Sequence, residues 1–168
     1  AKHELVASEG YRAFNCFFYS YEQNPPKGIG ELEELFNIWQ NKCKNNILPA
    51  WNDFSFESFK GWHSRIRLIK CGEMRDKADE VLIVGEKFTQ FWGRQSLSEQ
   101  IRTGKVTSES VINQFRKYVQ YLTDHCYAIN IGKLPVENIS FQPILFMDLP
   151  LSENGRDVTH AISAITPI

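Results

Sequence analysis

Two groups of strand-like segments on either side of a helical stretch constrain the fold of this chain more than any other sequence feature. In residues 65–69, charged and apolar side chains alternate, which is typical of a half-buried strand. The polar, glycine-containing run CGEMRDKAD follows, and it favours a hairpin-like link to a second, antiparallel strand at residues 78–84. The turn-forming runs PVEN and SENGRD separate three further predicted strands, at residues 126–134, 139–147 and 158–166.

Three helices are predicted between the second and third of these strands. The clearest lies at residues 108–123, where apolar side chains recur at helical spacing. A shorter helix at residues 86–92 is ended by Gly93, and another at residues 96–102 begins with the capping residue Ser96. Strands grouped before and after a block of helices favour an α+β fold, with one antiparallel sheet covered by helices on a single face.

The N-terminal part of the chain is expected to be an aromatic amphipathic helix joined to the rest by a linker. In residues 5–23, aromatic side chains recur at spacings that fit one face of a helix. The run NPPKGIG at residues 24–30 ends this helix, because proline cannot continue it. A second helix with an acidic first turn is predicted at residues 31–45. The chain is thus divided into an N-terminal extension, residues 1–30, and a main domain, residues 31–168.

The apolar face of the N-terminal helix leaves two alternatives open. The helix either folds back on its own sheet or pairs with its copy in a second chain. The second alternative predicts a homodimer that forms through the N-terminal helix.

The composition fits a globular domain that binds neither nucleic acid nor membrane. The chain has 168 residues, of which 42% are hydrophobic and 23% are charged. A formal net charge of -1 gives no general attraction for phosphate backbones or anionic lipids, and Arg65 and Arg67 are interpreted as a solvated strand face. No stretch predicts a transmembrane helix, and residues 1–9 lack the apolar core of a secretory signal, so a cytoplasmic location is expected.

The cysteine and histidine positions give no metal or cofactor motif. The four cysteines form no C-x-x-C pair, so they are expected to be reduced, buried thiols rather than zinc ligands. His63, His125 and His160 are expected to be satisfied by hydrogen bonds or to face solvent. No positioned histidine or cysteine favours haem or flavin, so the sequence assigns no cofactor.

The most aromatic part of the chain, residues 46–62, has neither helical nor strand periodicity. We expect its aromatic side chains to seal one end of the hydrophobic core, each contributing about 2 kcal/mol of burial. An aromatic ligand cage is the alternative. Asp53 is expected to act as a cap or turn acceptor. The aromatic residues are Trp51, Phe54, Phe56, Phe59 and Trp62.

Several positions between residues 32 and 166 share their order and spacing with a known family. They are Trp39, Leu48, Pro49, Asp53, Phe54, Phe59, Trp62, Val84, Gly85, Glu86, Phe91, Trp92, Gly93 and Arg94. In these positions the chain resembles the PAS-like sensor domains of bacteria, in the variant with an N-terminal helix and an L-P-x-x-x-D-F segment. The resemblance implies a five-stranded antiparallel sheet that cups short helices, with a small ligand or cofactor held between sheet and helices in many members.

A ligand held in this way is expected to contact the central helices and the later strands. Arg94 follows the helix-ending Gly93, and it is interpreted as a partner for an anionic ligand, as a cap on the preceding helix, or as a solvated residue. The expected ligand-binding residues are Phe91, Trp92, Arg94, Phe115, Tyr118, Tyr127, Ile129 and Phe141.

These features predict a non-enzymatic sensory or regulatory domain. It is expected to bind a small molecule and to signal through dimer contacts or through a signalling protein partner. No catalytic residue and no metal ligand is predicted. Two alternatives stay open: a protein–protein interaction module with a filled core, and a small enzyme that uses the cavity with His125 or His160 as general base.

Overall fold

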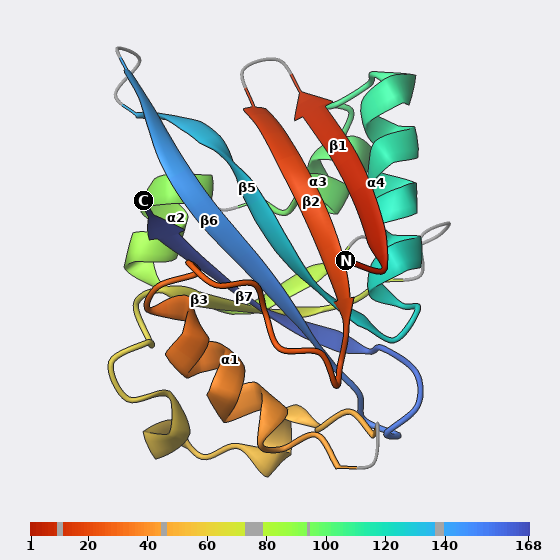
Figure 1. The fold of residues 1–168 in the computed structure, drawn as a ribbon. Coiled ribbons are helices and arrows are strands. Elements are labelled where there is room, and N and C mark those ends of the chain that lie inside the picture. The colour runs from red at the N-terminus through yellow and green to blue at the C-terminus, as the bar shows by residue number, and fades with distance from the viewer. Residues whose placement is uncertain (10–11, 45–46, 73–78, 94, 137–139) are drawn as a thin grey trace.

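A seven-stranded antiparallel sheet runs through the molecule, with helices on both of its faces (Figure 1). The computed structural model describes residues 1–9, 12–44, 47–72, 79–93, 95–136 and 140–168. The strand order across the sheet is β1-β2-β5-β6-β7-β3-β4, and every neighbouring pair is antiparallel. The strands are β1 (His3–Glu9), β2 (Arg12–Ser20), β3 (Ile66–Lys70), β4 (Glu80–Val84), β5 (Cys126–Val136), β6 (Ser140–Leu151) and β7 (His160–Pro167).

The N-terminal residues form two strands, so the predicted N-terminal helix is wrong. Strand β2 pairs with β1 on one side and with β5 on the other. Phe18 faces helix α4 (Glu109–Leu122), whereas Tyr19 packs in the core on the opposite face. A strand that is covered on both faces can carry apolar side chains on both. Its sequence then lacks the alternation of polar and apolar residues that distinguishes a strand from a helix.

The five predicted strands are present as β3 to β7, but the predicted fold class is wrong in two respects. The sheet has seven strands rather than five, because the N-terminal hairpin extends it beyond β5. The helices also lie on two faces rather than one (Figure 1). Helices α2 (Glu86–Trp92), α3 (Leu97–Arg102) and α4 cover one face, and α1 (Leu32–Gln40) covers the other.

Helix α1 fills the space above its face of the sheet with large side chains. Phe36 and Trp39 are fully buried and contact Tyr127 of β5, with ring centroids 4.8 and 5.7 Å apart respectively. The indole Nε1 of Trp39 also donates a hydrogen bond to the carbonyl oxygen of Pro150 on β6, at 2.8 Å. This face of the sheet is therefore a packed core.

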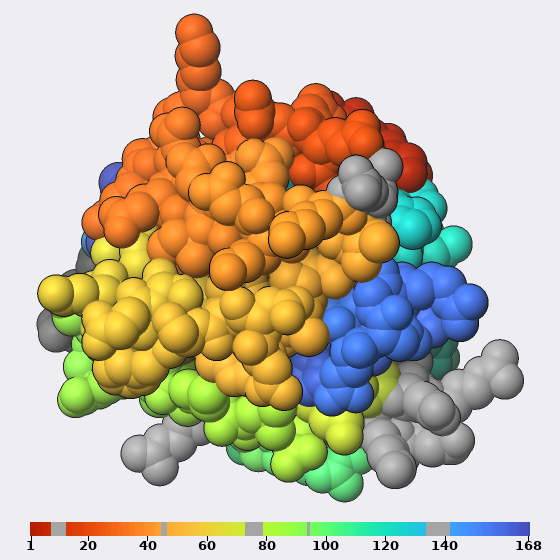
Figure 2. Space-filling view, turned by 90° about the horizontal axis from the view of Figure 1, so that it is seen from below, coloured from red at the N-terminus to blue at the C-terminus, as the bar shows by residue number. Residues whose placement is uncertain are grey.

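The aromatic segment after α1 closes one end of this core, as predicted. It contains the short 3₁₀ helices η1 (Trp51–Asp53) and η2 (Phe56–Phe59). Figure 2 shows residues 47–62 in orange to yellow beside α1. Phe59 and Trp62 are buried, and Trp51 stacks on Phe59 at 5.4 Å. Phe56 is the exception, since it is 76% exposed. Asp53 accepts a hydrogen bond from the Ala50 amide at 2.8 Å, which confirms its predicted role as a turn acceptor.

The other face of the sheet is covered by separate helices. Helix α4 packs on the N-terminal hairpin, with Tyr118 and Tyr121 both edge-on to Phe18. Helix α2 packs on β6, where Phe88 contacts Phe146. At the start of α2, a Cβ on Gly85 would lie 2.2 Å from the carbonyl carbon of Ser64, so only glycine allows this close approach. Within the described part of the chain, no helix has the length and apolar character needed to cross a membrane.

Candidate functional site

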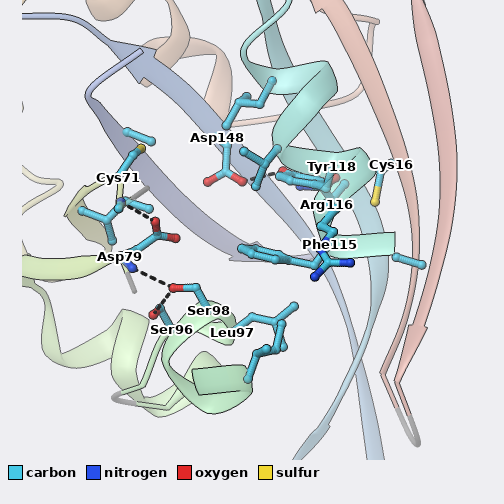
Figure 3. Close-up of a pocket in the computed structure, with 18 of the residues that line it drawn as sticks. Cys16, Cys71, Asp79, Ser96, Leu97, Ser98, Phe115, Arg116, Tyr118 and Asp148 are labelled. Atoms are coloured by element: carbon cyan, nitrogen blue, oxygen red, sulfur yellow. Dashed lines mark hydrogen bonds between the residues drawn. The ribbon is translucent and has the colours of Figure 1, made fainter. Parts of the chain in front are cut away.

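A cavity of about 480 Å³ lies between the sheet and helices α3 and α4 (Figure 3). Its volume is within the range of small-molecule binding sites. Most of its walls are apolar, with a few polar groups among them. The apolar walls include Ile69, Leu97, Ile101, Phe115, Val119 and Phe146.

Helix α4 supplies one wall through the spacing of its side chains. Ile112, Phe115, Val119 and Leu122 line the cavity at helical intervals. The helix begins after Ser108, whose hydroxyl oxygen accepts a hydrogen bond from the Val111 amide. Figure 3 shows the ring of Phe115 projecting from α4 into the cavity, opposite α3.

The sheet supplies a floor that contains a row of polar residues. Asp148 of β6 is paired in register with Ser163 of β7, and Ser163 is paired with Arg67 of β3. Because residues paired across strands point to the same face, all three side chains face the helices α2 to α4. Asn130 of β5 lies on this face one register position away, opposite Phe146.

Asp148 is the centre of a buried hydrogen-bond network. It accepts hydrogen bonds from the Tyr118 hydroxyl at 2.5 Å and from the Ser163 hydroxyl. The Asn130 amide donates in turn to the Tyr118 oxygen at 2.8 Å. Burial raises the pKa of Asp148 above its ordinary value, although these two hydroxyl donors and Arg67 act in the opposite direction. The network joins α4 to three residues of the sheet.

Arg67 is the second buried charged residue of the floor. It is 7% exposed, and its Nε and Nη1 atoms have no hydrogen-bond partner among the described residues. The guanidinium lies over the ring of Phe88, 4.8 Å from the ring centroid. Burial lowers the pKa of Arg67, while Asp148 and Asp79 raise it.

The interpretation of Arg65 and Arg67 as a solvated strand face is wrong. Arg65 forms an ion pair with Glu31 at 2.7 Å and stacks on Trp62, and Arg67 is buried beneath α2. The prediction failed because it assumed that one face of the sheet was open. In the structure, helices cover both faces of β3.

Three of the predicted ligand-binding residues line the cavity: Trp92, Phe115 and Tyr118. Phe91 instead packs beside the cluster of Phe88 and Phe146. Arg94 and the side chain of Phe141 lie outside the described residues.

Tyr127 and Ile129, also expected to bind the ligand, lie on the face of the sheet opposite the cavity. Both are buried in the core beneath α1, and the Tyr127 hydroxyl donates to the carbonyl oxygen of Gln23 at 2.6 Å. The alternate residues of β5, Ala128 and Asn130, face the helices that enclose the cavity.

The polar floor was missed, although the sequence carries a signal for it. Asp148 interrupts the apolar run ILFMDLPL, and Asn130 interrupts AINIG. A polar residue in the middle of an otherwise apolar strand is usually buried with a specific partner. Asp148, Asn130 and Arg67 are all less than 10% exposed.

The histidines lie away from the cavity, as its lining residues show. His63 stacks on Phe56, and His160 is hydrogen-bonded to Thr159 at 2.8 Å. Neither His125 nor His160 lines this cavity, and His125 lies instead at a second, smaller pocket beside Tyr21. Among the residues that the structure describes, no group of three or more metal-binding side chains occurs.

The cysteines are free thiols, and two of them line the cavity. Cys16 is buried and Cys71 is half-buried, and both contribute to the cavity wall. Burial raises the pKa of each thiol to about 12. Both are therefore protonated at neutral pH and are poor nucleophiles.

No family model, curated protein or solved structure matches this chain. The resemblance to PAS-like sensor domains therefore stays a prediction. The functional assignment depends on the cavity and on the residues that line it.

Proposed function

We propose that this chain is a non-enzymatic ligand-binding domain of the sensory or regulatory type. It holds a small molecule in the cavity between the sheet and helices α3 and α4. The observation that carries the proposal is the cavity itself, with a volume of about 480 Å³, apolar walls and a short polar row on its floor. Such a combination of apolar surface and few oriented polar groups is typical of small-molecule sites.

The chemistry of the lining residues favours binding over catalysis. Asp148 already accepts two hydroxyl donors, and burial raises the pKa of Tyr118 well above its ordinary value. The cavity thiols are held in their protonated form. Both Asp148 oxygens are thus occupied, and Tyr118 and the thiols keep their protons at neutral pH, so none of these groups is placed as a free general base.

The cavity also favours ligand binding over an interaction module with a filled core. A filled core would pack side chains between α4 and the sheet as densely as α1 packs on the opposite face. The two faces of this sheet differ in this respect. One is occupied by Phe36 and Trp39, and the other leaves room for a ligand.

The route from ligand to output stays a prediction. A homodimer through an N-terminal helix is no longer supported, because residues 3–9 and 12–20 form strands. Dimer contacts elsewhere on the surface, or a signalling protein partner, are the alternatives. Sedimentation velocity of the purified chain decides whether it self-associates.

Ligand binding is tested with the neutral fluorescent probe N-phenyl-1-naphthylamine, which is apolar and carries no charge. The wild-type chain is expected to bind one probe molecule with a rise in fluorescence. Val119→Trp fills the cavity from α4 and should weaken binding by roughly tenfold or more, which is at least about 1.4 kcal/mol.

Gln120→Trp is the matched control, because it adds the same side chain at an exposed position of the same helix. It should bind the probe as wild type does. Thermal unfolding of both variants establishes that they are folded. Absence of probe binding in wild type, or equal binding by the two variants, contradicts the proposal.

A further inference from the structure

The guanidinium of Arg67 has unused hydrogen-bonding capacity at the floor of the cavity. The residue is more than nine-tenths buried and lines the cavity, yet Nε and Nη1 find no acceptor among the described residues. Buried charged groups in proteins are almost always paired, because a charge that is removed from water without a partner is costly. Because Nε and Nη1 have almost no accessible surface, a ligand in the cavity that Arg67 lines can supply their acceptor when the guanidinium turns toward it.

The two nearby carboxylates do not fill this role. Asp148 directs its oxygens to the Tyr118 and Ser163 hydroxyls. Asp79 accepts a hydrogen bond from the Gly72 amide at 2.9 Å, as Figure 3 shows. Within the described part of the chain, neither carboxylate forms an ion pair with Arg67. Burial also favours the neutral form of Asp148, which weakens it as a counter-charge.

Two more arginines line the cavity on its solvent side. Arg102 comes from α3 and Arg116 from α4, and both are exposed. Figure 3 shows Arg116 beside Phe115. Among the described lining residues, these cations and Arg67 outnumber the acidic residues Asp79 and Asp148. The positive excess favours entry of an anion.

We propose that the ligand is an organic acid with an apolar body, and that its anionic group accepts hydrogen bonds from Arg67. The inference rests on the proposed function, because it concerns the same cavity. The apolar body lies against Phe115 and Val119 of α4 and Leu97 of α3. A neutral ligand of the same shape would fill the apolar space but leave the guanidinium without a counter-charge.

Two probes that differ only in charge test this inference. 8-Anilinonaphthalene-1-sulfonate has the same ring system as N-phenyl-1-naphthylamine and adds one sulfonate. Hydrogen bonds to a charged group are stronger than those between neutral groups. We therefore expect the wild-type chain to bind the sulfonate probe roughly tenfold or more tightly than the neutral probe. Val119→Trp should weaken the binding of both probes by roughly tenfold or more, which places them in the cavity.

Arg67→Met should lower the ratio of sulfonate affinity to neutral-probe affinity to about one. Arg67→Lys keeps the charge and should retain part of the preference. Arg156→Met is the matched control, because it removes the same charge from an exposed site whose side chain is 84% accessible. It should behave as wild type. Thermal unfolding of each variant confirms folding.

The outcomes separate this inference from the proposed function. If wild type binds neither probe, the proposed function fails. If it binds both probes equally, ligand binding stands and the organic-acid inference is overturned. If the preference persists in Arg67→Met, Arg67 is not the anion partner. Should Arg67→Met fail to fold, the wild-type comparison and Arg67→Lys still decide the question.

Discussion

The hydroxyl of Tyr118 connects helix α4 to two strands of the sheet. It donates to Asp148 of β6 and accepts from Asn130 of β5. Removing it would leave the Asn130 amide and one Asp148 oxygen without their partner in a buried place. A buried polar group without a partner lowers the free energy of unfolding by more than the net contribution of a typical hydrogen bond.

Tyr118→Phe is therefore expected to lower the free energy of unfolding by about 1–3 kcal/mol. Tyr121→Phe is the matched control on the same helix, since the Tyr121 hydroxyl has no hydrogen-bond partner among the described residues. The free energy of unfolding of Tyr121→Phe should stay within about 0.5 kcal/mol of the wild-type value. Urea denaturation measures both, and equal losses in the two variants would contradict the assigned network.

Asp148 gives the stability a pH dependence of defined sign. Burial raises its pKa above the ordinary value of about 3.9, so the folded state holds the proton more tightly than the unfolded chain. The stability that Asp148 contributes is then complete below about pH 4 and declines as the pH rises through the raised pKa.

The comparison of wild type with Asp148→Asn isolates this contribution. The wild-type free energy of unfolding should fall relative to that of the variant as the pH rises from about 4. The reverse trend would show that the Tyr118 and Ser163 hydrogen bonds outweigh burial and lower the pKa instead. Denaturation at a series of pH values distinguishes the two signs.

Local sequence signals predicted the helices and strands of the main domain well. They did not predict which elements cover each face of the sheet. Helix α2 was predicted with its observed bounds, and Gly93 marks its end. The strands β3 to β7 were also found from alternation and turn residues. These signals lie within a few residues of the element that they define.

The predictions that were wrong all required knowledge of which element covers each face of the sheet. Strand β2 has side chains packed on both faces, so its aromatic spacing was mistaken for a helix. Tyr127 and Arg67 were misplaced because nothing near them in the sequence shows that α1 covers one face and α2 the other. The identity of the covering element is a property of the tertiary structure.

Helix α1 and the cavity lie on opposite faces, so they should respond independently to substitution. Trp39→Leu removes buried aromatic volume and the hydrogen bond to Pro150, and it should cost about 2–4 kcal/mol of stability. The affinity for N-phenyl-1-naphthylamine should stay within about twofold of wild type. Asn37→Ala, at an exposed position of α1, should change neither quantity.

Denaturation and probe titration of these two variants test the separation of the faces. A loss of probe affinity in Trp39→Leu as large as that of Val119→Trp would show that the two faces are coupled. The packed face would then take part in binding.

The whole molecule is a three-layer arrangement with unequal outer layers. One layer, α1 with the aromatic segment after it, packs on the sheet as a core. The other, α2 to α4, encloses a cavity with buried polar groups on its floor. This inequality is the basis for assigning ligand binding to one face only.

Nuclear magnetic resonance tests this assignment most directly, through amide shifts of the labelled chain during titration with 8-anilinonaphthalene-1-sulfonate. We expect saturable shifts in α3, in α4 and in the sheet around Arg67 and Asp148, with α1 unchanged. Shifts confined to residues outside the cavity, or none at saturating probe, would contradict ligand binding between the sheet and these helices.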